Sequence, residues 1–82
     1  MIENELKKNL KILYGAMENQ QRIAVEFIKD STRYAFQGYV LSLSNSFVII
    51  EEYEGDKEDG IRIEFIRDLV FCAGIFEKES LL

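Results

Sequence analysis

The stretch "RYAFQGYVLSLS", residues 33–44, decides which fold this chain can adopt. It is rich in aromatic and aliphatic residues, which is typical of a β-strand. Such a strand is too long to stay straight in the small sheet that 82 residues can build. Gly38 lies at its middle, where the missing side chain permits a sharp bend. The stretch therefore favours a small, strongly bent β-barrel.

The length limits the chain to one domain with a modest core, so a large active-site cleft is not expected. Its composition, 48% hydrophobic and 30% charged, is that of an ordinary folded domain. We expect a single domain over residues 1–82. It would comprise a helix and connection over 1–20, a five-stranded barrel over 22–76 and a short tail over 77–82.

The spacing of apolar residues predicts one helix followed by five strands. Apolar residues recur every three or four positions from Ile2 to Tyr14, which predicts a helix that ends near Gly15 or continues through Met17. The acidic segment "GDKEDG" (55–60) is expected to form a hairpin tip. Beyond the helix the apolar spacing changes to two, and the expected strands cover residues 23–28, 33–44, 47–54, 61–65 and 69–76.

The last two strands have different patterns. In "IRIEF" (61–65), alternation predicts that Ile61, Ile63 and Phe65 point inward and that Arg62 and Glu64 point outward. "LVFCAGIF" (69–76) is apolar on both faces and therefore needs cover on both sides. Either a second copy of the chain pairs with it head to tail, which can close a ring, or the N-terminal helix and the tail cover it within one monomer. The expected contacts between copies are Ile61, Ile63, Phe65, Leu69, Phe71, Ala73 and Ile75.

The net charge of −5 is concentrated in "EEYEGDKEDG" (51–60), which holds six acids and one lysine. The rest of the chain is neutral, so it lacks the broad basic surface of sequence-independent nucleic-acid binders. The acidic segment lacks the ligand spacing of a calcium loop, and we expect a solvated hairpin without a metal. The chain has no histidine, and Cys72 lies in an apolar strand where filling the core is its expected role. We therefore expect neither an enzyme nor a cofactor.

The N-terminal residues "MIENELKKNLKILYG" carry acids and lysines throughout. We therefore expect neither a secretory signal nor a membrane span, and a cytoplasmic location.

The order of elements over residues 2–76 resembles the Sm-like family, whose members include the Sm, LSm and Hfq proteins. In "GYVLSLSNSFVII" (38–50), Gly38, Val40 and Phe47 match the first motif of that family. Ser44 stands where the family usually has Asp, and Val48 stands where eukaryotic and archaeal members have Asn. The resemblance implies an SH3-like or Sm-like barrel.

A second patch, "FIRD" (65–68), resembles the Ile-Arg-Gly turn that precedes the fifth strand in this family. Ile66 and Arg67 match it, and Asp68 replaces the glycine. From the residues alone, Arg67 is either a base-stacking residue or the partner of Asp68 or Glu64 in a local ion pair.

The resemblance implies a homo-oligomeric ring that binds single-stranded RNA at its pore. In the family, the turns after the second strand and before the fifth strand line the pore and hold uridine- or adenine-rich RNA, with bases stacked on side chains. An alternative stays open, in which the same small barrel docks a protein partner and binds no nucleic acid. The residues that the resemblance assigns to RNA are Ser44, Asn45, Ser46, Phe47 and Arg67.

Overall fold

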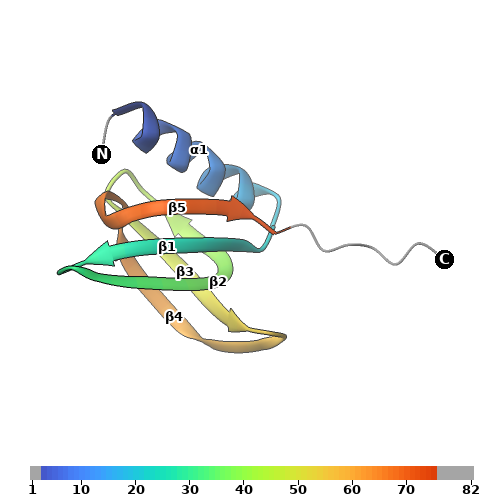
Figure 1. Ribbon diagram of the computed structural model, residues 1–82. Helices are drawn as coiled ribbons and strands as arrows, with labels where there is room; N and C mark the ends of the chain where they lie inside the picture. The colour runs from blue at the N-terminus through green and yellow to red at the C-terminus, as the bar shows by residue number, and fades with distance from the viewer. Residues whose placement is uncertain (1–2, 76–82) are drawn as a thin grey trace.

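The computed structural model describes residues 3–75, so expectations for Ile2, Phe76 and the 77–82 tail lie outside the described residues (Figure 1). It confirms a mostly β fold with an N-terminal helix. The elements are α1 (Glu3–Glu18), β1 (Ile23–Lys29), β2 (Thr32–Leu43), β3 (Phe47–Glu54), β4 (Lys57–Phe65), a 3-10 turn (Ile66–Asp68) and β5 (Leu69–Gly74).

Helix α1 continues past Gly15, as one of the two expected endings had it, and stops at Glu18. Gln20 adopts a left-handed backbone conformation, with φ of 51°, which ends the helix. Leu13 and Ala16 on its inner face are buried in the core. The apolar stripe of the helix therefore holds it against the core, and Gly15 does not end it.

The five strands form one antiparallel sheet in the order β4-β3-β2-β1-β5. In this order β4 and β5 stand at opposite edges, and no ladder joins them among residues 3–75. The sheet is therefore open, and the strands of the single chain do not close into the barrel that the sequence predicted. Helix α1 packs on one face of this sheet against β2 and β5 (Figure 1).

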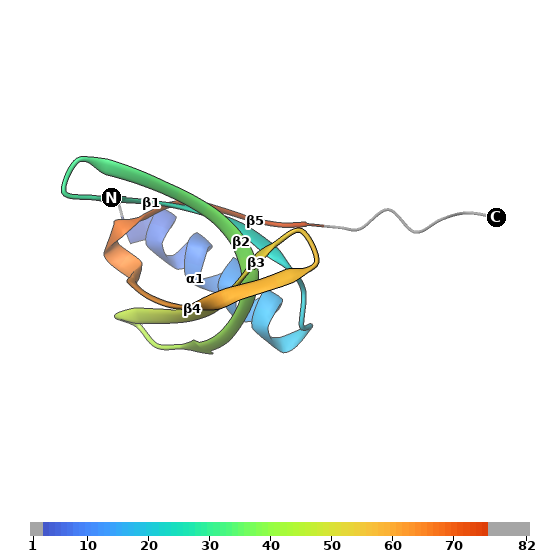
Figure 2. The same ribbon diagram turned by 90° about the horizontal axis from the view of Figure 1, so that it is seen from below.

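Gly38 is required where β2 and β3 approach closely. It lies opposite Ile23 of β1 and Glu52 of β3. A Cβ atom at this position would overlap the carbonyl oxygen of Glu51 and lie 2.9 Å from Cγ2 of Ile50. Figure 2 shows β2 curving strongly across the sheet, in agreement with the bend expected from the sequence.

The core lies between α1 and the inner face of the sheet. The rings of Phe27 and Phe36 stack in it with their centroids 5.7 Å apart. Cys72 is buried there, as expected for a core-filling cysteine. The buried apolar residues are Leu13, Ala16, Ile23, Val25, Phe27, Phe36, Val40, Val48, Ile50, Ile66, Leu69 and Cys72.

The expected orientation of β4 is wrong. Ile61 and Ile63 are 54% and 63% exposed, whereas Arg62 and Glu64 share the inner face with the core. The cause is the pairing of β4 with β3, which places Arg62 directly opposite the buried Ile50. Residues that face each other across an antiparallel pair lie on the same side of the sheet.

Arg62 is accommodated on the inner face by ion pairs and by an aromatic ring. Its guanidinium nitrogens lie 3.3 Å from a carboxylate oxygen of Glu52 and 3.2 Å from one of Glu64. The guanidinium carbon also lies 4.6 Å from the centroid of the Phe36 ring. A half-buried cation is thus paired and stacked, which offsets the cost of removing it from water.

The hairpin tip is shorter than expected. The turn consists of residues 55–56, and residues 57–60 already belong to β4. Tyr53 pairs with Glu58 and Glu54 pairs with Lys57, so the ladder continues almost to the tip. Most of the acidic segment is therefore strand rather than loop.

Over residues 3–75, no helix is long and apolar enough to cross a membrane.

Replacing Gly38 with alanine tests the close approach of β2 and β3. We expect Gly38→Ala to lower the free energy of unfolding by about 2 kcal/mol or more, because the new methyl group meets backbone that cannot move aside cheaply. Urea denaturation measures this. The matched control is Gly15→Ala, since Gly15 lies within α1 with no atom near its added Cβ, and this change should stabilise by about 0.5–1 kcal/mol. Equal effects of the two changes would contradict the role of Gly38.

Candidate functional site

The turn between β2 and β3 is closed by hydrogen bonds around Ser44. Its hydroxyl oxygen accepts hydrogen bonds from the backbone N–H groups of Ser46, at 3.2 Å, and Phe47, at 3.0 Å. The backbone N–H of Ser44 donates to the carbonyl oxygen of Phe47 at 2.9 Å. A serine hydroxyl here organises the turn as a short acidic side chain would. Asn45 is left exposed at the tip.

A backbone hydrogen bond holds this turn against the 3-10 turn before β5. The N–H of Ile66 donates to the carbonyl oxygen of Ser46 at 2.9 Å. The Ile66 side chain is fully buried and anchors the 3-10 turn to the core. The structure thus places the β2–β3 turn next to the 3-10 turn that carries Arg67, although two strands separate these turns in the sequence.

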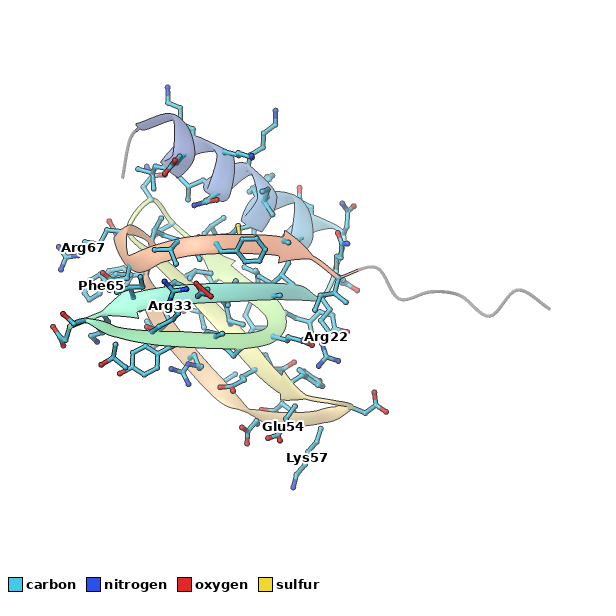
Figure 3. The ribbon with its side chains drawn as sticks, viewed as in Figure 1. Arg22, Arg33, Glu54, Lys57, Phe65 and Arg67 are labelled. Carbon is cyan, nitrogen blue, oxygen red and sulfur yellow. The ribbon has the colours of Figure 1, made fainter. Side chains whose placement is uncertain are left out.

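Phe47, Phe65 and Arg67 form a stack next to the two turns. Phe47 pairs with Phe65 across β3 and β4, and their ring centroids are 4.8 Å apart. The guanidinium carbon of Arg67 lies 4.8 Å from the centroid of the Phe65 ring. Figure 3 shows Arg67 beside Phe65 at one end of the sheet. Phe47 is 43% exposed, so the stack is open to solvent on one side.

Sequence reasoning missed Phe65 as a member of this site, because Phe65 was expected to point inward and to contribute to the contact between copies. The strand pairing could have identified it. A hairpin with a two-residue turn at 55–56 and one β-bulge between Glu51 and Tyr53 places residue 65 directly opposite residue 47.

Arg67 forms no ion pair within residues 3–75. The nearby Glu64 lies on the inner face and is engaged by Arg62 at 3.2 Å. Arg67 is exposed and lies over the Phe65 ring instead. The alternative of a local ion pair with Asp68 or Glu64 is therefore wrong. Its guanidinium offers a planar cationic surface and free donors to a ligand.

The outer face of β3 and β4 carries an exposed apolar surface. Across the two strands Phe47 lies opposite Phe65, and Ile49 lies opposite Ile63. Ile61 follows in the next outward position of β4. We call this surface the outer ladder, and it consists of Phe47, Ile49, Ile61, Ile63 and Phe65.

The edge strand β5 presents a second apolar surface. Phe71 is 53% exposed, and Val70, which lies at a register shift against β1, is 45% exposed. Ala73 and Ile75 are half-buried. Leu69, which was expected at the contact between copies, is fully buried in the core of its own chain and has no surface to offer.

An aromatic cluster lies at the opposite end of β3 from the stack. The rings of Tyr39 and Tyr53 meet edge to face at 5.3 Å, and the guanidinium carbon of Arg22 lies 5.6 Å from the Tyr53 centroid. Partial desolvation of the Tyr53 side chain raises its pKa, and the charge and hydrogen bond of the Glu51 carboxylate, followed by the Glu58 carboxylate, act in the same direction. The negative potential of these carboxylates disfavours phosphate groups at this end of the sheet.

Within residues 3–75, no three His, Cys, Asp or Glu side chains are grouped so as to hold a metal ion. The Cys72 thiol lies 3.6 Å from Oδ1 of Asn9. Burial raises its pKa from 9.0 to about 11, although the nearby Lys8 ammonium acts in the opposite direction. A thiol held neutral in this way is a poor nucleophile.

The chain matches no protein-family model, no curated protein and no solved structure. Its likeness to the Sm-like family therefore rests on the order of its elements and on the two local motifs.

The environment of Cys72 predicts that its thiol reacts slowly and that the reaction rate depends strongly on pH. Because the raised pKa lowers the thiolate fraction near pH 8, we expect Ellman's reagent to react about a hundredfold more slowly with the folded chain than with the urea-unfolded chain. The folded rate should go on rising with pH toward 11 instead of levelling off near 9. A stopped-flow pH series measures both rates, and equal rates at pH 8 would show that Cys72 is accessible and unperturbed.

Proposed function

We propose that this chain is an Sm-like protein that assembles head to tail into a homo-oligomeric ring and binds single-stranded RNA at the pore. The observation that carries the proposal is the exposed stack of Phe47, Phe65 and Arg67. The hydrogen bond between Ile66 and Ser46 holds it beside the β2–β3 turn. Two turns that are distant in sequence thereby form one local site.

Ring assembly is supported by the two open edges of the sheet. Within residues 3–75, each edge strand has backbone N–H and C=O groups without a neighbouring strand. Each also carries exposed apolar side chains, Ile61 and Ile63 on β4 and Val70 and Phe71 on β5. Pairing β4 of one copy with β5 of the next satisfies both edges. Because the two surfaces differ, the contact is head to tail, and repetition closes a ring when the rotation permits.

RNA binding is supported by the chemistry of the stack. A nucleobase can lie on the exposed aromatic surface of Phe47 or against the Arg67 guanidinium, as bases do on single-strand-binding proteins. The Asn45 amide at the neighbouring turn offers both a donor and an acceptor for a base edge. Since the body of the chain is neutral, phosphate contacts are few, and the salt dependence of binding should be shallow.

The second candidate is a protein-interaction module that binds no nucleic acid. The outer ladder favours it, because exposed isoleucines on the face of a sheet are typical of surfaces that bind other proteins. Fluorescence anisotropy with oligo-U and oligo-A at low salt separates the two candidates, since the module predicts no binding to either.

The ring predicts that the β5 edge is needed for assembly. In Phe71→Lys an ammonium group would be buried at the contact between copies, so we expect the wild-type oligomer to fall apart into smaller species in native mass spectrometry. The control is Leu41→Lys, which changes a residue of similar exposure, 51% against 53%, away from both edges. A wild-type chain that is monomeric at every concentration would overturn the ring.

The stack predicts a specific role for Arg67. We expect Arg67→Ala to weaken binding of oligo-U by about tenfold or more, since a stacked base contributes about 1–3 kcal/mol. The matched control is Arg33→Ala, which removes an exposed arginine that is instead paired with Glu26 at 2.8 Å. Equal losses in the two variants would indicate a general charge effect rather than a stack at Arg67.

A further inference from the structure

The outer ladder is an apolar surface that the elements within residues 3–75 leave uncovered. Helix α1 covers the inner face of the sheet against β2 and β5, so it does not reach the outer face of β3 and β4. Ile61 and Ile63 are more than half exposed, and Phe47 nearly so. Pairing of sheet edges in a ring would leave this face open as well, because edge pairing extends a sheet without covering either face.

The two ends of the outer ladder carry opposite charge. At one end, the Arg67 guanidinium lies exposed over Phe65, while the next residue, Asp68, is half-buried. At the other end, Glu51 lies directly opposite Ile61 on the same face. The surface thus runs from a cation, over apolar side chains, to an anion.

A surface with this order of charges is complementary to itself. When a second copy is turned by 180° about an axis that lies in the contact plane and runs across the strands, the two faces meet with the anion of each opposite the cation of the other, and with apolar side chains opposite apolar side chains. Outward rows on a strand are about 7 Å apart. An axis between the Phe47–Phe65 and Ile49–Ile63 rows therefore brings each Arg67 near the Glu51 of the other copy.

We propose that the outer ladder is a two-fold contact between two copies of this chain, in which Arg67 of each copy pairs with Glu51 of the other. A symmetric contact of this kind needs one patch that matches itself, which is the arrangement found here. The apolar rows supply the buried area and the two ion pairs set the orientation. Another protein would need a matching bipolar surface, which a second copy already has.

This contact is independent of the edge pairing proposed for the ring. It joins faces rather than edges, so it would pair two rings, or two single chains when the edge contact is absent. It also uses the Arg67 guanidinium that the proposed RNA stack needs. Oligo-U and the second copy should therefore exclude each other at this site.

A charge-reversal cycle in the Phe71→Lys chain tests the contact, because this background removes the proposed edge pairing. We expect the Phe71→Lys chain to form dimers in sedimentation velocity. Adding Arg67→Glu or Glu51→Arg alone should raise the dimer dissociation constant about tenfold or more, since like charges then meet at both ends. Combining the two reversals should restore association to near the starting value, because opposite charges meet again.

Lys29→Glu is the matched control, since it reverses an exposed charge on β1 away from the outer ladder, and it should leave the dimer unchanged. Circular dichroism of each variant checks that the fold is retained. A Phe71→Lys chain that stays monomeric, or a double reversal that associates no better than the single reversals, overturns the two-fold contact. Neither result bears on the ring, because native mass spectrometry of the wild-type chain tests the ring separately.

Discussion

The close approach of β2 and β3 at Gly38 is the constraint on which the rest of the structure depends. Only a residue without a side chain lets the carbonyl group of Glu51 come so near to β2. With that approach the long second strand can curve, and β3 and β4 follow it away from β1. The antiparallel pairing of β3 with β4 then places the end of β4 beside the start of β3, where Ile66 enters the core and its N–H reaches Ser46.

Two consequences of this bent, open sheet bear on function. The first is a local site, in which Phe47 of β3 and Arg67 of the 3-10 turn both lie against the Phe65 ring. The second is a surplus of uncovered apolar surface, on the two edge strands and on the outer ladder. A chain of this size cannot easily cover every face that its strands create, which is the physical basis of the contacts proposed between copies. Arg67 belongs to both features, so the proposed RNA binding and the proposed face-to-face contact require the same residue.

Much of the fold could be predicted from the spacing of apolar residues, which is two in strands and three to four in helices. The first three strands, the buried role of Cys72 and the bend at Gly38 follow from such patterns and agree with the structure. The orientation of β4 could not be predicted, because alternation in "IRIEF" says that two faces differ but not which one meets the core. The pairing with β3 decided that Arg62 lies inward, where Glu52, Glu64 and the Phe36 ring stabilise it.

The sequence by itself determined the kinds of elements and their order, because local spacing and glycine placement act over a few residues. Only the tertiary structure decided that Phe65 joins Phe47 and Arg67, and that Leu69 is core rather than contact. It also decided that β4 and β5 are the two edges of the sheet, with no partner strand among residues 3–75. These facts depend on strand register and on which face the helix covers. Both arise from contacts between residues far apart in the chain, and no local pattern encodes them.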